Sequence, residues 1–279
     1  MQQLIVTADD YGMCDIVDKA IDAGIENGFI TTTNVMLNME SLENARTLRN
    51  RYNNISVGIH WNVTTGRPIL DPATIPSLVQ TNGMFWPISV FKKRYSKRLI
   101  NPKELEKELE AQANLFESVC GKADYWNTHE NSALHTKAFR IFAKVAKNHG
   151  ITATRTFQRV YYDKQNLGFK KTFREFIVKN FFECWFTRIR KQFVMPTARV
   201  VSFNKISKTE GNVLLNSIIK DGRDNIEIVF HPSVSSEHEY FGNISTERVK
   251  EYEFVSSKNV YDAYKGNDIK FVNFSVLTK

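Results

Sequence analysis

The feature that most constrains the fold is the alternation of short apolar runs with amphipathic stretches. Runs such as 4–8, 55–60 and 226–230 have the length and apolar content of buried strands. Stretches such as 16–28 and 101–121 repeat apolar residues at three- and four-residue spacing, as amphipathic helices do. Strands that alternate with helices form βαβ units, so the sequence predicts an α/β fold with a parallel sheet.

The same pattern continues along most of the chain. Further strands are expected at 29–38, 125–129, 151–155 and 270–274, and further helices at 41–51, 138–146, 213–220 and 246–258. The alternation is interrupted from about residue 157 to residue 204, where basic and aromatic residues predominate. Because no internal repeat or low-complexity linker divides the chain, we expect one domain over residues 1–279 with a helical insertion or cap at about 157–204.

The positive charge is concentrated in one region. The net charge is +8, but residues 155–208 hold thirteen basic and three acidic side chains, which sum to +10 and leave −2 for the rest. A solvated face is the commoner reason for such a patch. The alternatives are peripheral contact with an anionic membrane and binding of a phosphate-bearing substrate. No nucleic-acid-binding motif accompanies it, so no nucleic acid partner is expected.

Targeting signals are also lacking in the sequence. No apolar run approaches the roughly 20 residues of a membrane span. The first residues contain no basic segment followed by a signal-like apolar core. We therefore expect a cytoplasmic protein with no transmembrane segment.

The first apolar run ends abruptly at two adjacent carboxylates, Asp9 and Asp10. In α/β proteins the carboxyl ends of parallel strands are where ligands bind and chemistry occurs. The segment Asp-Asp-Tyr-Gly is also good turn composition, so an acidic turn with no further role is the alternative on this stretch alone.

Three of the six histidines, His60, His129 and His231, follow or end predicted strands. A lone histidine in a strand is more often a structural hydrogen-bonding group than a ligand. Placement at the same edge of a parallel sheet is therefore the informative observation, because it allows these side chains to converge with the Asp pair. His135, His149 and His238 lie at helix or loop positions, and we assign them structural roles.

Two histidines and one carboxylate around a metal ion leave positions open for water and substrate. Such a set suits zinc, iron, cobalt or manganese. With Asp10, His60 and His129 as ligands, Asp9 is available as a general base and His231 as a general acid. The inventory therefore fits metal-assisted hydrolysis.

Five segments carry a resemblance to a known family, the YdjC-like carbohydrate deacetylases, which act on chitooligosaccharides and hopanoid-linked sugars. They are Ala-Asp-Asp-Tyr-Gly at 8–12, Gly-Phe-Ile-Thr-Thr-Thr at 28–33, Val-Gly-Ile-His-Trp-Asn at 57–62, Asn-Thr-His at 127–129 and Phe-His-Pro-Ser at 230–233. The resemblance runs in order through most of the chain. It implies an irregular (β/α) barrel related to the NodB-type polysaccharide deacetylases, often a homodimer, that binds one divalent metal ion.

The resemblance also implies residue roles. The family's metal ligands fall on Asp10, His60 and His129, its base on Asp9 and its general acid on His231. Arg155 resembles an arginine that orients the base or the substrate. The ion expected first is magnesium or zinc, followed by manganese, cobalt or iron.

The chain departs from the family pattern at two places. The segment His-Glu-Asn-Ser-Ala at 129–133 keeps only the first of the alternating histidines found in many relatives, and Pro-Ser at 232–233 replaces Pro-Gly. The first change alters expected substrate contacts, so chitooligosaccharide specificity is not carried over. We expect a hydrolase that removes an acetyl group from an N-acetylated sugar or glycan. The alternatives are a metal-dependent phosphoesterase on the same scaffold and a non-catalytic carbohydrate-binding protein.

Overall fold

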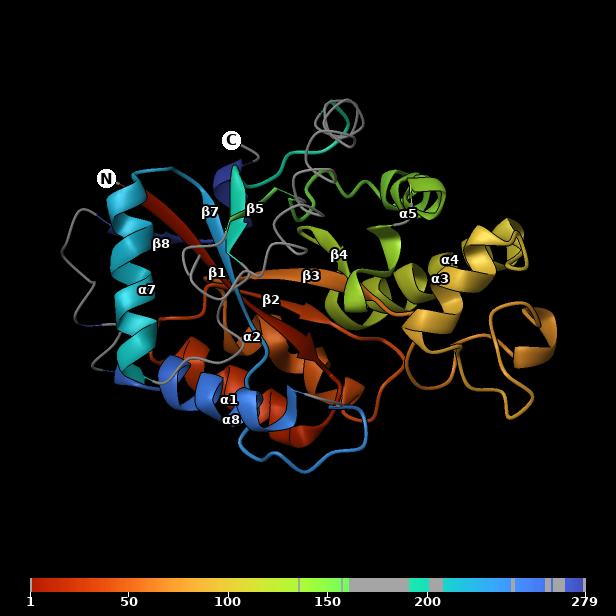
Figure 1. Ribbon diagram of the computed structural model, residues 1–279, viewed down its shortest axis with the longest axis horizontal. Coiled ribbons are helices and arrows are strands. Elements are labelled where there is room, and N and C mark those ends of the chain that lie inside the picture. Colours follow the sequence, from red (N-terminus) through yellow and green to blue (C-terminus); the bar gives the residue numbers. More distant parts are fainter. Residues whose placement is uncertain are drawn as a thin grey trace, which may run out of the picture. The chain divides into compact units, whose positions relative to one another are not determined.

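The computed structural model describes residues 2–134, 136–156, 158–160, 191–200, 208–241, 244–258, 262 and 269–277 (Figure 1). The chain forms two compact units: unit 1 comprises Met1–Ala8, Ala20–Thr32 and Thr152–Lys279, and unit 2 comprises Asp9–Lys19 and Thr33–Ile151. Most of the insertion predicted at 157–204 lies outside the described residues. Within the described part of the chain, no helix is both long enough and apolar enough to cross a membrane.

Most of the described elements alternate as the sequence predicts. The exceptions are the helix α3, which was not expected, and the strands β5 and β6, which lie at the two ends of the stretch predicted as a helical insertion and pair within the sheet. The strands are β1 Gln2–Tyr11, β2 Thr32–Val35, β3 Ser56–Trp61, β4 Trp126–Thr128, β5 Arg159–Val160, β6 Ala198–Val200, β7 Ile226–Phe230 and β8 Ile269–Val272. The α-helices are α1 Asp15–Glu26, α2 Leu48–Arg51, α3 Ile88–Ser96, α4 Pro102–Cys120, α5 Thr136–Asn148, α7 Lys208–Asp221 and α8 Ser245–Val255. Short 3-10 helices are η1 Leu42–Thr47, η2 Pro72–Thr74, η3 His129–Leu134 and η5 Phe274–Leu277.

In unit 1, the first part of β1 pairs in parallel with both β7 and β8, and β6 and β5 follow β7 in the sheet. The register of β1 with β7 ends at the pair Ala8 and Phe230. The ring of Phe29 packs edge-on against Phe230 and Phe254, with centroids 5.8 and 5.6 Å apart. These buried aromatic rings fix β7 and α8 within the core of unit 1.

In unit 2, β3 lies between β2 and β4, and the end of β1 adjoins β2, where Met36 N–H donates to the Tyr11 carbonyl at 2.8 Å. The β3 and β4 strands are parallel, and His60 is the register partner of Asn127. Buried rings of Trp61 and Trp126, with centroids 5.3 Å apart, pack beneath these strands. The carboxyl ends of β1, β3 and β4 thus belong to one compact unit.

Helix α4 forms where the sequence predicts it. The Asn101 side chain accepts a hydrogen bond from Lys103 N–H at 3.0 Å, Pro102 occupies the first helical position, and Gly121 follows the last turn with φ 72°. A side-chain acceptor before the helix, proline at its start and glycine after its end are local signals, so the helix bounds follow from the sequence.

The strand predicted at 151–155 is wrong. Ala153 forms only an isolated parallel bridge with Val194, framed by hydrogen bonds from Thr154 N–H to the Val194 carbonyl and from Val194 N–H to the Thr152 carbonyl, each 2.9 Å. The next donor along the partner segment would be Pro196, which has no N–H, so the ladder stops after one residue. Smaller differences are that the helix predicted at 41–51 is divided into η1 and α2, and that the strand predicted at 29–38 is confined to β2.

Candidate metal centre

The last residues of β1 bring both carboxylates of the Asp pair to one network. Successive side chains of a regular strand point to opposite faces. Asp10, however, has φ 75°, in the left-handed region that non-glycine residues rarely adopt. This local turn of the backbone allows Asp9 and Asp10, only 2% and 1% exposed, to reach side chains of the same neighbouring strands.

The turn after the Asp pair is held by hydrogen bonds. Gly12 has φ 87°, and a Cβ atom there would lie 2.9 Å from the Met36 carbonyl oxygen, so only glycine fits. Gly12 N–H donates to Asp18 Oδ1 at 2.7 Å, and Arg51 Nη2 donates to the Tyr11 hydroxyl at 2.6 Å. These contacts fix the direction in which β1 presents its carboxylates.

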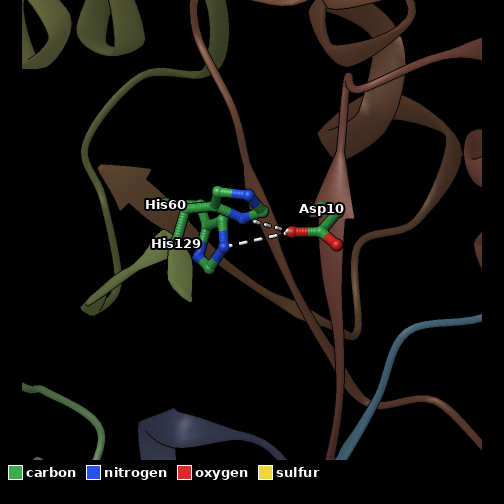
Figure 2. A group of neighbouring side chains, drawn as sticks. All are labelled: Asp10, His60 and His129. Atoms are coloured by element: carbon green, nitrogen blue, oxygen red, sulfur yellow. Dashed lines mark hydrogen bonds and ion pairs between the residues drawn. The ribbon is translucent and has the colours of Figure 1, made fainter. Parts of the chain in front are cut away.

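His60 from β3 and His129 at the start of η3 both point at Asp10 (Figure 2). The distances to Asp10 Oδ1 are 3.2 Å from His60 Nε2 and 3.1 Å from His129 Nδ1. Both histidines are buried. Glu130 and Asn131, which follow His129, have φ 50° and 53°, so the chain leaves this ligand position through two left-handed residues.

Asp10, His60 and His129 fit a metal ion. One ligand atom from each lies within 4.8 Å of the others, and no other group of this kind is found among the described residues. Two ligand atoms that each lie about 2.1 Å from an ion, at angles of about 90–110°, are about 3.0–3.4 Å apart. The observed 3.1 and 3.2 Å separations match that range. Two imidazoles and one carboxylate fill three coordination positions of a metal ion and leave the remaining positions for water or substrate.

Asp9 lies beside this cluster and is held by two amide side chains. Asn34 Nδ2 donates to Asp9 Oδ1 at 2.5 Å, and Asn127 Nδ2 donates to the same oxygen at 3.3 Å. Asn34 Nδ2 also donates to the Tyr125 hydroxyl at 3.0 Å. Asn127 Oδ1 lies 2.5 Å from His60 Nδ1, so one side chain joins the expected base to an expected metal ligand.

The remaining predicted residues, Arg155 and His231, belong to unit 1. Arg155 Nε donates to the fully buried Glu227 at 2.9 Å. His231 directly follows β7, and its backbone N–H donates to the Glu251 carboxylate of α8, while Arg248 Nη1 contacts its carbonyl oxygen at 3.5 Å. Helix α8 thus contacts both the backbone N–H and the backbone carbonyl of His231.

Reasoning from sequence missed the amides and the α8 residues around these side chains. Asn34 is a polar residue inside a β-branched strand, and Asn127 precedes His129 by two residues, so it projects from the same face of the chain. These two placements were the features of the sequence that could have indicated a role for Asn34 and Asn127. Glu251 carries none, because a glutamate in an amphipathic helix is ordinarily solvent-exposed.

Comparison with known proteins identifies the family to which the chain belongs. A family described as YdjC-like protein matches residues 3–266. The chain belongs to this YdjC-like family. A carbohydrate deacetylase from Clostridium beijerinckii is 27% identical over 278 residues, which cover 98% of each chain. A chitooligosaccharide deacetylase from Yersinia pestis is 32% identical over 136 residues, but this match covers 47% of the present chain and 49% of that relative.

Solved structures support the fold of this YdjC-like protein. A proposed cellobiose-phosphate cleavage protein from Enterococcus faecalis superposes with a TM-score of 0.76 at 22% identity, covering 99% of this chain and 98% of that one. A peptidoglycan N-acetylglucosamine deacetylase superposes with a TM-score of 0.50 at 10% identity, covering 99% and 87%. At these identities the similarity concerns the fold alone, and it confirms the α/β fold that the sequence predicts.

Proposed function

We propose that this YdjC-like protein is a carbohydrate deacetylase, a metal-dependent hydrolase that removes an acetyl group from an N-acetylated sugar or glycan. The observation that carries the proposal is the buried set Asp10, His60 and His129 with the carboxylate of Asp9 beside it. The name of the Clostridium beijerinckii relative, which matches over nearly its whole length, supports the same activity.

Asp10, His60 Nε2 and His129 Nδ1 would hold one divalent ion. Two imidazole ligands favour zinc or a similar transition metal over magnesium, because magnesium prefers oxygen ligands. When bound, such an ion supplies Lewis acidity toward the acetamide carbonyl and lowers the pKa of water.

The chain's own residues would move the protons. Asp9 accepts a proton from water as the water oxygen bonds to the acetyl carbon. His231 donates a proton to the amine nitrogen as the C–N bond breaks, so acetate and the free amine leave.

The test is acetate release by zinc- or magnesium-reconstituted protein from a panel of N-acetylated monosaccharides, oligosaccharides and nucleotide sugars. Wild type is expected to release acetate, and Asp9→Asn is expected to bind the same amount of metal but to lose at least about 100-fold in kcat. The proposal fails if wild type with one bound metal ion releases no acetate from any member of the panel.

The same assay separates the alternatives. A phosphoesterase commonly uses two metal ions, so two bound ions together with phosphate release would favour that activity. Sugar binding that is unchanged in Asp9→Asn, without turnover by wild type, would favour a binding protein. Homodimer formation, a cytoplasmic location and contact of Arg155 with the base or substrate stay predictions of the sequence.

A further inference from the structure

The Asn127 side chain occupies a position between the expected base and a metal ligand. It extends from β4 opposite His60 in the register of β3 and β4. Its two polar atoms have different partners: Oδ1 lies 2.5 Å from His60 Nδ1, and Nδ2 lies 3.3 Å from Asp9 Oδ1. Asp9, His60 and Asn127 are 2%, 2% and 3% exposed, so bulk water does not compete for these contacts.

The chemistry of these partners fixes the orientation of the amide. The carboxylate of Asp9 accepts hydrogen bonds, so it requires the NH₂ group of Asn127. The amide oxygen must then face His60, and it can accept only if His60 Nδ1 carries a hydrogen. In a neutral imidazole the other nitrogen is unprotonated, and this nitrogen, Nε2, is the one that points at Asp10 Oδ1 at 3.2 Å.

Asn34 contributes a second, independent restraint on Asp9. Its NH₂ group donates to Asp9 Oδ1 at 2.5 Å and to the Tyr125 hydroxyl at 3.0 Å, which uses both of its hydrogens. Asn34 and Tyr125 are fully buried. The Tyr125 ring lies against Gly58 of β3, where a Cβ atom would be only 2.3 Å from the ring. The Asn34 amide therefore has one orientation, with NH₂ toward the carboxylate.

We propose that Asn127 and Asn34 are positioning residues with separable tasks. Asn127 sets the tautomer of His60 so that Nε2 is available to a metal ion, and it helps to hold the Asp9 carboxylate. Asn34 acts on Asp9 alone. The tasks that concern Asp9 rest on the proposed function, whereas the task at His60 concerns metal binding and does not.

The test compares two measurements, zinc affinity of the metal-free protein by chelator competition and kcat with KM for acetate release. Asn127→Ala is expected to lower zinc affinity by about 10–100-fold, the usual cost of removing a partner that orients a ligating histidine. Asn127→Asp keeps an acceptor for His60 Nδ1 but removes the donor to Asp9, so zinc affinity should stay within about threefold while kcat falls about 10–100-fold. Asn34→Ala should lower kcat similarly and leave zinc affinity and KM within about threefold.

A double-variant comparison distinguishes positioning from general structural damage. If Asn34 acts through Asp9, Asn34→Ala should reduce kcat in the wild-type background but not in the Asp9→Asn background. The matched control is Asn148→Ala. Asn148, at the exposed end of α5, donates a hydrogen bond to Glu110 of α4, so its loss should leave zinc affinity and kcat unchanged. If Asn127→Ala does not fold, Asn127→Ser, whose hydroxyl is too short to reach both partners, replaces it.

Specific results would overturn the inference. Zinc affinity of a folded Asn127→Ala variant equal to that of wild type would remove the task at His60. Equal kcat losses for Asn34→Ala in both backgrounds would remove the positioning of Asp9. If wild type releases no acetate, the proposed function fails, yet the zinc titration still decides the His60 task. In that case, crystal structures of Asn34→Ala and wild type test the positioning of Asp9 by Asn34. An Asp9 carboxylate that does not move between the two structures would refute this task.

Discussion

The close approach of Tyr125 to β3 makes Gly58→Ala a demanding test of the packing around Asp9. A Cβ atom at position 58 would lie 2.3, 2.6 and 2.7 Å from three atoms of the Tyr125 ring. Ordinary contacts of a Cβ atom are 3.4 Å or longer, so the ring must retreat by about 1.1 Å, the difference between 3.4 and 2.3 Å. Tyr125 is fully buried, and a buried aromatic ring cannot swing into solvent as a surface side chain would.

The expected cost follows from this displacement. Overpacking of a well-packed core usually costs about 1–3 kcal/mol, and a rigid ring as obstacle predicts the upper half of that range. For a chain of this size, about 2 kcal/mol lowers Tm by about 4–8 °C. The same shift disturbs the 3.0 Å hydrogen bond between Asn34 and the Tyr125 hydroxyl, so kcat for acetate release should fall together with Tm.

Thermal unfolding followed by circular dichroism measures the stability term. Gly121→Ala is the matched control: Gly121 has φ 72° but no atom within 4 Å of an added Cβ, so it reports backbone strain of about 1 kcal/mol without a clash. In a Tyr125→Leu background, Gly58→Ala should cost much less, because the ring is gone. A Tm for Gly58→Ala within about 1 °C of wild type, or an undiminished cost in the Tyr125→Leu background, would refute the reasoning.

Three further predictions concern unit 2. His129→Ala should lower zinc affinity more than about 100-fold in chelator competition, because it removes a ligand rather than a partner of one; a value within threefold of wild type would contradict the ligand assignment. His149 lies between two glutamates of α4 at 2.7 and 2.8 Å; burial lowers its pKa, but these hydrogen bonds outweigh burial and raise the pKa overall. The stabilisation of the fold by protonated His149 is complete below about pH 6.5 and is lost as pH rises through the raised pKa. His149→Gln should therefore cost about 0.5–1 kcal/mol in urea unfolding at pH 6 and less at pH 9. Equal costs at the two pH values would exclude this linkage. Glu108→Leu removes the buried acceptor of the backbone N–H groups of residues 69 and 70 and should cost about 2–4 kcal/mol of stability. The control Glu106→Leu, which removes an exposed ion pair on the same helix, should cost under about 1 kcal/mol. Similar Tm values for the two variants would argue against the role of the buried carboxylate.

The order and type of most elements could be predicted because their causes are local. The bounds of α4 depend on Asn101, Pro102 and Gly121, which act on the helix ends within a few residues. The strand predicted at 151–155 failed because its length depends on a partner segment forty residues away, where Pro196 supplies no donor. Local sequence therefore indicates where a strand can form, whereas its length depends on the partner segment with which it pairs.

The candidate site divides in the same way. The sequence by itself determined that carboxylates and histidines follow strands that run in one direction, so Asp10, His60 and His129 were expected at one edge of a parallel sheet, and the structure brings their ligand atoms within 4.8 Å. Only the tertiary structure decided the register that sets Asn127 opposite His60, the left-handed backbone of Asp10 and the contact of Asn34 with Tyr125. The physical reason is the separation along the sequence over which each interaction acts. Side-chain periodicity and capping act between near neighbours in sequence, whereas a hydrogen bond between residues 67 or 91 positions apart exists only after the strands have paired.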